Sequence, residues 1–321
     1  MTDPALPSCV KNISPAGAAV RKLLHRPAAV FAFAVIALFG AAAIASEIHG
    51  AIAESAGTEP LYQIEEPSLE PGIITGQHWL GVDYLGRDIF WRAIAGTATA
   101  FKVGIIGAGI AVLIGTFLGL LAGYAGGIVD AVVVWLYSVF AAMPTLLFVL
   151  AFALLADKGF LPESIMSGVE SIASLLRTDA ATLSVYTAIG LTGWSSMCIV
   201  IRAEVMKISG RPFVAASKVA GVGTLKILFR HILPNISYLV ITFFTLRFAY
   251  AVMTEVIVSF LGVGGRSVPS WGMMIANGQE RLWRGDFLEV GTATFCVFML
   301  VLAFQLAGDQ LRDILDPRNN R

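Results

Sequence analysis

The chain has 321 residues, of which 57% are hydrophobic and only 14% are charged, whereas a soluble domain carries about 25% charged residues. The 22 basic and 22 acidic residues balance, which argues against a strongly basic nucleic-acid binder. The three cysteines lie far apart and form no CxxC pair, so we expect neither a disulfide framework nor a metal site.

The charge deficit is concentrated in six long apolar segments. They cover residues 27–46, 103–129, 131–156, 180–201, 236–262 and 290–308. A bilayer core about 30 Å thick requires roughly 20 apolar helical residues to cross it. The sequence therefore predicts an all-α polytopic membrane protein with six transmembrane helices.

The first apolar segment, 27–46, follows a polar N-terminal tail, residues 1–26. Residues 43–45 resemble a signal-peptide cleavage site, but the apolar segment is longer than the roughly 7–15 residues of a signal core. We therefore expect an uncleaved first transmembrane helix. The loop 47–102 follows, and its first part, 47–86, contains six glutamates and no lysine or arginine.

The second and third apolar segments begin a core of five helices over 103–308. Only residues 126–130 separate these two segments, so we expect a tight helical hairpin. Glycines recur every four residues in the second segment and create a smooth face for close helix packing; sliding of this face during transport is the functional alternative. The stripe consists of Gly115, Gly119 and Gly123. Pro144 lies inside the third segment and should bend it.

The distribution of Lys and Arg orients the predicted helices. Six spans place both ends on one side, and the cytoplasmic side carries more basic residues in its short loops. With both ends inside, the segments 1–26, 202–234 and 309–321 contain four, six and three basic residues. The acidic loop 47–102 then falls outside the cytoplasm. We therefore predict an N-in, C-in arrangement.

The basic cytoplasmic segment 202–234 predicts two short helices. The first consists of small and apolar residues and stops at Gly221. The second is amphipathic, and we expect Pro234 to close it. Its apolar side consists of Leu225, Leu228 and Phe229. Such a pair suits insertion into a groove on a soluble partner and equally suits lying on anionic membrane lipid.

Arg247 and Glu255 are the only charged residues inside the fifth apolar segment. Charges at such depth are costly and suggest a function. Eight residues apart, they lie about 80° apart around a helix and can face one lumen without pairing directly. Both are therefore possible pathway residues. The alternative for Glu255 is a polar anchor near the outer end of the helix.

Motifs for catalysis are missing from the sequence. There is no GxxxxGK[ST] phosphate loop. Residues 193–196 lack the closing glycine of a nucleophile motif, and the four histidines lie outside the apolar segments. We expect no catalytic residue, no metal ligand and no cofactor bound by this chain. Uphill transport would then depend on an ATPase partner or on an ion gradient.

Several segments resemble a known transporter family. Residues 215–221, Ala-Ala-Ser-Lys-Val-Ala-Gly, followed nine residues later by His231-Ile232-Leu233-Pro234, resemble the loop by which permease subunits of bacterial ABC importers dock into their ATPase. Ala215 stands where that family usually has glutamate. Residues 78–88, 255–272 and 308–318 resemble segments of the second permease subunit of dipeptide, oligopeptide and nickel importers.

The resemblance covers roughly residues 75–321 and implies a type I ABC importer permease fold in the bacterial inner membrane. It implies a heterodimer with a second permease subunit, two ATPase subunits that bind ATP and Mg, an extracytoplasmic solute-binding protein, and no nucleic acid. The implied cargo is a di- or oligopeptide; nickel or another small solute is the alternative. The rival from another class is an ion-coupled secondary carrier.

The resemblance also implies the residues of two sites. The ATPase-coupling residues are Ala215, Ala216, Ser217, Gly221, His231, Leu233 and Pro234. The outer-loop residues, which would gate the pathway or receive the binding protein, are Pro269, Ser270, Trp271 and Gly272. Gly221 leads the first set because a side chain there would crowd the turn, and Leu233 with Pro234 would fix the second helix.

Overall fold

The computed structural model describes residues 23, 25–66, 69, 71–72, 74, 76, 78–158, 163–264 and 269–315. Its helices are α2 (Pro27–Ala56), α3 (Ile89–Ala125), α4 (Gly127–Ala142), α5 (Thr145–Asp157), α6 (Glu163–Leu175), α7 (Ala180–Ser209), α8 (Pro212–Val219), α9 (Thr224–Ile227), the π-helix η1 (Leu228–Ile232), α10 (Leu233–Phe260), α11 (Trp271–Gly278), the 3₁₀-helix η2 (Gln279–Arg284) and α12 (Leu288–Leu315). The prediction of an all-α fold is confirmed.

Within the described part of the chain, five helical segments are long and apolar enough to cross a membrane: α2, α3, α7, the stretch containing α10, and α12. The pair α4 and α5 supplies a sixth crossing if it counts as one broken span. Pro144 stands in this break, where its ring cannot continue a regular helix. The two helices meet at 88°, so the predicted bend is close to a right angle.

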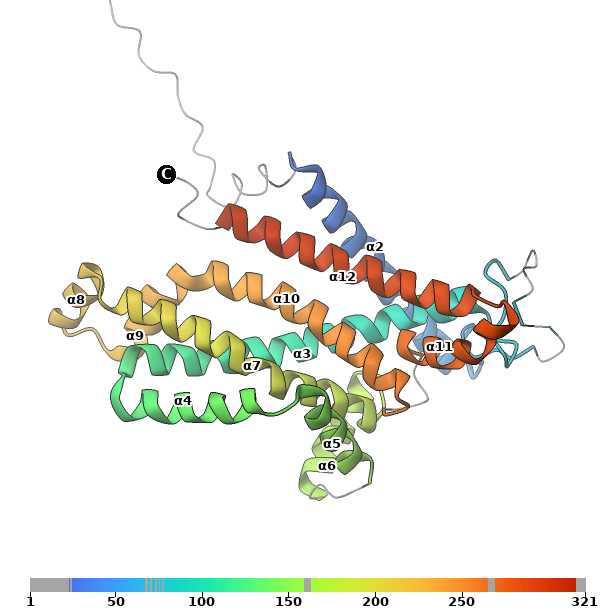
Figure 1. Ribbon diagram of the computed structural model, residues 1–321, viewed down its shortest axis with the longest axis horizontal. Helices are drawn as coiled ribbons and strands as arrows, with labels where there is room; N and C mark the ends of the chain where they lie inside the picture. Colours follow the sequence, from blue (N-terminus) through green and yellow to red (C-terminus); the bar gives the residue numbers. More distant parts are fainter. Residues whose placement is uncertain are drawn as a thin grey trace, which may run out of the picture.

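The long helices lie side by side, with α8 and α9 at one end of the bundle and α11 at the other (Figure 1). We call these the α8 end and the α11 end. The central helix is α3, which packs against α2, α7, α10 and α12. The start of α2 meets the last turns of α12, where Arg26 Nη1 lies 3.0 Å from Asp313 Oδ2. The start of the first long helix and the end of the last one therefore lie together. A chain that crosses the membrane an even number of times requires this arrangement.

The helices run past the predicted apolar segments. α2 continues to Ala56, and α3 begins at Ile89, so both ends of the predicted loop 47–102 are helical. Asp88 caps α3 by accepting a hydrogen bond from the Trp91 amide at 3.1 Å, which satisfies an amide that the helix itself leaves unpaired. α12 extends into the predicted tail as far as Leu315, and residues 1–22 and 316–321 lie outside the described part.

The glycine stripe of α3 faces α7. A Cβ atom at Gly115 would lie 2.8 Å from the carbonyl oxygen of Trp194. A Cβ atom at Gly119 would lie 2.8 Å from the Cβ of Ile201, and Gly123 is equally close to α7. These distances leave no room for a side chain, so the stripe brings the two helix backbones into direct contact. The packing role predicted for these glycines is confirmed.

Replacing Gly119 with leucine is expected to force α3 away from α7, at a cost of about 1–3 kcal/mol or more. Gly109 provides a matched control on the same helix, because no atom lies within 4 Å of the position of its Cβ. The yield and thermal unfolding of both variants in detergent measure the effect. Equal stability of Gly119→Leu and Gly109→Leu would contradict this packing.

Candidate functional site

The short helix α8 and the turn after it project from the α8 end. α8 starts at Pro212, whose fixed φ suits a first helical turn, and stops before Gly221. Gly221 adopts φ 71°, a left-handed conformation that glycine takes readily. A Cβ atom there would meet nothing within 4 Å. The expectation that a side chain would crowd this turn is therefore wrong, and the backbone conformation is what requires glycine.

The second predicted helix does not end at Pro234. Instead α9, η1 and α10 form one helical stretch, Thr224–Phe260, and Pro234 lies in the first turn of α10. The reason is the π turn of η1, in which the Leu233 amide donates to the carbonyl of Leu228, five residues back. The wider turn accommodates a proline that cannot donate a hydrogen bond of its own.

The apolar residues of this stretch divide between two sides. Leu228 is buried with Ile227 and Ile232 beneath α3 and α7, whereas Leu225 and Phe229 point outward. The prediction that Leu225, Leu228 and Phe229 share one side is therefore wrong for Leu228. The exposed large apolar side chains on α8, α9 and η1 are Phe213 (38%), Val219 (91%), Leu225 (64%) and Phe229 (53%). We call these four residues the tip patch.

Three contacts hold the α8 end together. Val214 of α8 is fully buried in a cluster with residues of α7. The Lys218 ammonium lies 4.7 Å from the centre of the Tyr124 ring at the end of α3, within the range of a cation–π interaction. Arg202 of α7 forms two hydrogen bonds with Asp130 of α4. The tip patch is therefore connected to α3, α4 and α7.

The structure places the predicted coupling residues around this element. Ala215, Ala216 and Gly221 are exposed on α8 and its turn, and Ser217 is partly buried. His231 and Leu233 are partly buried at the root of α10, beside the exposed Pro234. The coupling residues on α8 and those at the start of α10 therefore flank the tip patch. The family resemblance did not assign a coupling role to the four residues of the tip patch.

At the α11 end, the turn before α3 is built around Asp83. This carboxylate is fully buried and accepts hydrogen bonds from the amides of Leu85 at 2.8 Å and Arg87 at 3.0 Å. It also binds the guanidinium groups of Arg87 at 2.8 Å and Arg92 at 3.6 Å. One acidic residue thus joins the turn to the first helical turns of α3.

Replacing Asp83 with alanine is expected to destabilise the fold by about 3–5 kcal/mol, the cost of leaving a buried partner charge uncompensated. The uncompensated group is Arg92, whose side chain is 4% exposed. Replacing the exposed Glu59 with alanine is the control. Thermal unfolding of the two variants in detergent checks the difference, and an Asp83→Ala variant as stable as Glu59→Ala would refute this role.

Two of the predicted outer-loop residues attach to α3. Thr99 Oγ1 donates to the carbonyl of Pro269 at 2.7 Å, and Trp271 Nε1 donates to the carbonyl of Ala93 at 2.9 Å. Trp271 is 1% exposed, and Gly96 provides the space for its ring, because a Cβ there would lie 2.6 Å from the indole. This segment is therefore packed into the bundle.

The other two outer-loop residues fix the start of α11 against α10. Ser270 caps α11 by accepting a hydrogen bond from the amide of Met273 at 3.2 Å. A Cβ atom at Gly272 would lie 2.4 Å from the carbonyl oxygen of Val256, so the backbones of α11 and α10 are in contact. Any movement of α10 therefore reaches α11 directly.

Glu255 and Arg247 have different surroundings. Glu255 is 3% exposed and accepts a hydrogen bond from Ser259 Oγ at 2.6 Å; Ser270 of the outer loop also hydrogen-bonds to it. A cavity of about 10 Å³ adjoins it, which is room for about one water molecule. This favours the polar anchor over the pathway role for Glu255. Arg247 is partly exposed and lies over Tyr250.

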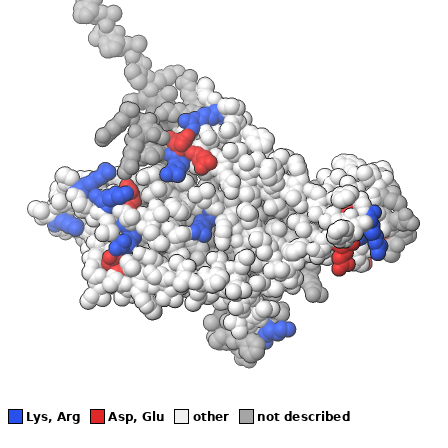
Figure 2. Space-filling model, in the orientation of Figure 1, with Lys and Arg blue, Asp and Glu red and all other residues white. Residues whose placement is uncertain are grey.

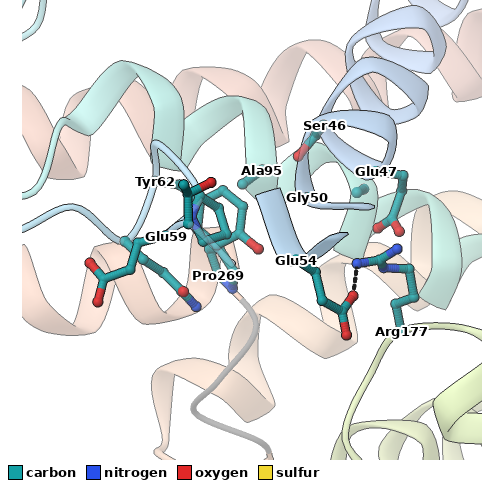
Figure 3. Close-up of a pocket in the computed structure, with 13 residues that line it drawn as sticks. Ser46, Glu47, Gly50, Glu54, Glu59, Tyr62, Ala95, Arg177 and Pro269 are labelled. Atoms are coloured by element: carbon teal, nitrogen blue, oxygen red, sulfur yellow. Dashed lines mark hydrogen bonds and ion pairs between the residues drawn. The ribbon is translucent and has the colours of Figure 1, made fainter. Parts of the chain in front are cut away.

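A cavity of about 350 Å³ lies at the α11 end among α2, α3 and the segment after α6 (Figure 3). Glu54 of α2 and Arg177 meet there in an ion pair. Glu47 binds Lys102 Nζ of α3 at 2.6 Å. Burial, with the nearby Glu47 carboxylate, raises the pKa of Tyr62. Two glutamates of the acidic stretch thus hold α2 against its neighbours.

Comparison with known proteins places this geometry in context. Residues 115–321 match the family described as "Binding-protein-dependent transport system inner membrane component". The chain is 31% identical to the dipeptide transport system permease protein DppC of Bacillus subtilis, over 80% of this chain and 73% of that protein. It is 31% identical to the oligopeptide transport system permease protein OppC of the same organism, over 75% and 72%. It is also 31% identical to the glutathione transport system permease protein GsiD of Pectobacterium atrosepticum, over 75% and 73%.

Proposed function

The chain belongs to the family of binding-protein-dependent inner-membrane transport components, and on that premise we propose that it forms the translocation pathway of an ATP-driven importer of di- or oligopeptides. The family consists of membrane transport components rather than enzymes. The relatives named above belong to dipeptide, oligopeptide and glutathione transport systems, and all three cargoes are peptides.

The observation that carries this proposal is the tip patch. Four apolar side chains stand exposed on α8, α9 and η1, and the basic residues Lys226 and Arg230 lie among them in sequence. Such an element fits a groove on a soluble partner. The tip extends past the ends of α3 and α4 (Figure 1), which favours a soluble partner over the membrane surface. We take that partner to be an ATPase subunit that binds ATP and Mg.

The complete importer would contain a second permease subunit, two ATPases and an extracytoplasmic binding protein. By the positive-inside rule, the basic residues of 202–234 favour a cytoplasmic α8 end. Both chain termini would then lie inside, and the α11 end would receive the binding protein. Nickel or another small solute is the alternative cargo. Among the described residues, no cluster of three or more His, Cys, Asp or Glu side chains is placed to hold a metal. For a nickel importer, metal specificity could reside in the binding protein.

The contacts within the chain suggest how the tip drives transport. Closure of the ATPase pair on ATP moves the tip, and Lys218, Val214 and the Arg202 ion pair carry that movement to α3, α4 and α7. The helical stretch Thr224–Phe260 is continuous, so movement at α9 also reaches α11 through the contact between Val256 and Gly272. The helices thereby expose the pathway alternately to each side.

Reconstitution in proteoliposomes tests this function. The chain, a second permease, the ATPases and the binding protein together should take up a radiolabelled dipeptide only when ATP is present. Uptake driven by an ion gradient in vesicles that contain this chain alone would instead establish the secondary carrier. Uptake of nickel without peptide would establish the alternative cargo.

A further inference from the structure

Arg247 is the one basic residue of α10. Figure 2 shows the face formed by α12, α10, α7 and α4, on which most charged groups lie toward the two ends. The middle of this face carries few charged groups, and Arg247 is partly exposed. The neighbouring Leu246 and Tyr250 are both 41% exposed. Arg247 therefore reaches the surface of this subunit in its apolar middle.

No carboxylate within the described residues forms an ion pair with Arg247. Glu255, the other charged residue of α10, is hydrogen-bonded to Ser259 and lies two turns farther along the helix. An unpaired guanidinium facing lipid hydrocarbon is strongly unfavourable. Because arginine stays protonated in proteins, this face requires water, an anion or a partner subunit rather than lipid.

The surroundings hold the guanidinium in a defined place. Its Cζ lies 5.5 Å from the centre of the Tyr250 ring, an arrangement that positions the cation without neutralising it. On the other side is Gly193 of α7, where a Cβ atom would lie 3.4 Å from Arg247 Nη1. The guanidinium therefore lies at the junction between α7 and α10.

We propose that Arg247 is a binding site for the carboxylate of the cargo during its passage through the membrane. The inference rests on the proposed function, because a di- or oligopeptide carries a free C-terminal carboxylate. A guanidinium binds a carboxylate through two parallel hydrogen bonds, which makes it better suited than an ammonium group. A cation without an internal partner lowers the cost of moving this anion across an otherwise apolar segment.

Uptake of a dipeptide and of its C-terminal amide by the complete reconstituted importer tests this role. In Arg247→Gln, uptake of the free-carboxylate peptide should fall about tenfold, the effect of losing one charge-assisted hydrogen bond. The amide-to-carboxylate uptake ratio should rise by a similar factor relative to wild type. The binding protein is the same in both samples, so a change in this ratio reports on the permease. Arg247→Lys should give an intermediate ratio.

Leu246→Gln is the matched control, since it places the same amide on the same exposed face and removes no charge; its uptake ratio should stay at the wild-type value. An unchanged ratio in Arg247→Gln, including equal loss of both peptides, would overturn the proposal. If uptake of both peptides fell equally and the second permease no longer co-purified with the variant, Arg247 would be assigned to an ion pair between subunits. Failure of the wild-type complex to import either peptide would instead refute the proposed function.

Discussion

Aspartate at both Val219 and Leu225 is expected to abolish ATP-driven uptake and to leave the chain inserted in the membrane. These side chains are 91% and 64% exposed in the isolated chain, so the substitutions disturb no internal packing. In the assembled importer the same positions would be buried against the ATPase. Burying two unpaired carboxylates there should weaken binding by more than about 100-fold. Co-purification of the ATPase with the double variant measures this directly.

Leu175→Asp is the control for adding an acidic group to an exposed apolar position. Leu175 is 82% exposed at the end of α6, away from the tip patch. This variant should retain the ATPase and transport normally. If the double variant also retained both, the tip patch would have no part in docking.

Glutamate at Gly221 is expected to abolish transport-coupled ATP hydrolysis while membrane insertion stays intact. Gly221 has φ 71°, and a side chain in that conformation costs roughly 1–2 kcal/mol. The turn would relax and change the angle between α8 and α9, so the two halves of the tip would no longer fit one groove. ATP hydrolysis stimulated by the loaded binding protein is the measurement.

Two further variants distinguish the effect of the left-handed backbone conformation from the effect of simply replacing a glycine. Asparagine tolerates the left-handed region, so Gly221→Asn should keep most of the stimulated hydrolysis. Gly223 has φ −60° and open space around it, so Gly223→Ala should behave as wild type. Full activity of Gly221→Glu would remove this turn from the coupling mechanism.

The membrane-spanning helices could be predicted from composition, but their ends could not, and the shorter helices α6 and α11 were not predicted. An apolar segment marks the part of a helix that crosses the membrane, whereas caps decide where the helix begins. Asp88 starts α3 at Ile89, well before the predicted apolar segment. Similarly, Pro144 indicated a bend, but the angle of the bend depends on how α5 packs against α7. A local sequence pattern reveals neither the cap at Asp88 nor this packing.

The tip was predicted in part. Gly221 was correctly identified as a turn, because a glycine after a helical stretch commonly adopts a left-handed conformation. The outward side of the second helix was not, because that side carries apolar residues beside the basic Lys226 and Arg230, so amphipathicity alone could not identify it. Ile227 and Ile232 face the bundle, whereas Leu225 and Phe229 face outward. The π turn also departs from the regular helical period on which the prediction depended.

The two charges within α10 show a different limit. In the sequence, Arg247 and Glu255 are equivalent possibilities for the pathway. Their neighbours come from distant segments: Ser270 binds Glu255, and Gly193 of α7 lies beside Arg247. Only the packing of α10 against α7 and α11 distinguishes Glu255, an internal anchor, from Arg247, a charge that remains available for binding.

Photo-crosslinking from Val219 tests the central claim most directly, namely that a separate ATPase holds the tip. A photoreactive amino acid at Val219, in the importer assembled in native membranes, should form its main covalent adduct with the ATPase subunit. The same residue at Leu175 should not. Reaction of the Val219 probe only with lipid, or its access to a membrane-impermeant reagent from outside the cell, would contradict the proposed docking and orientation.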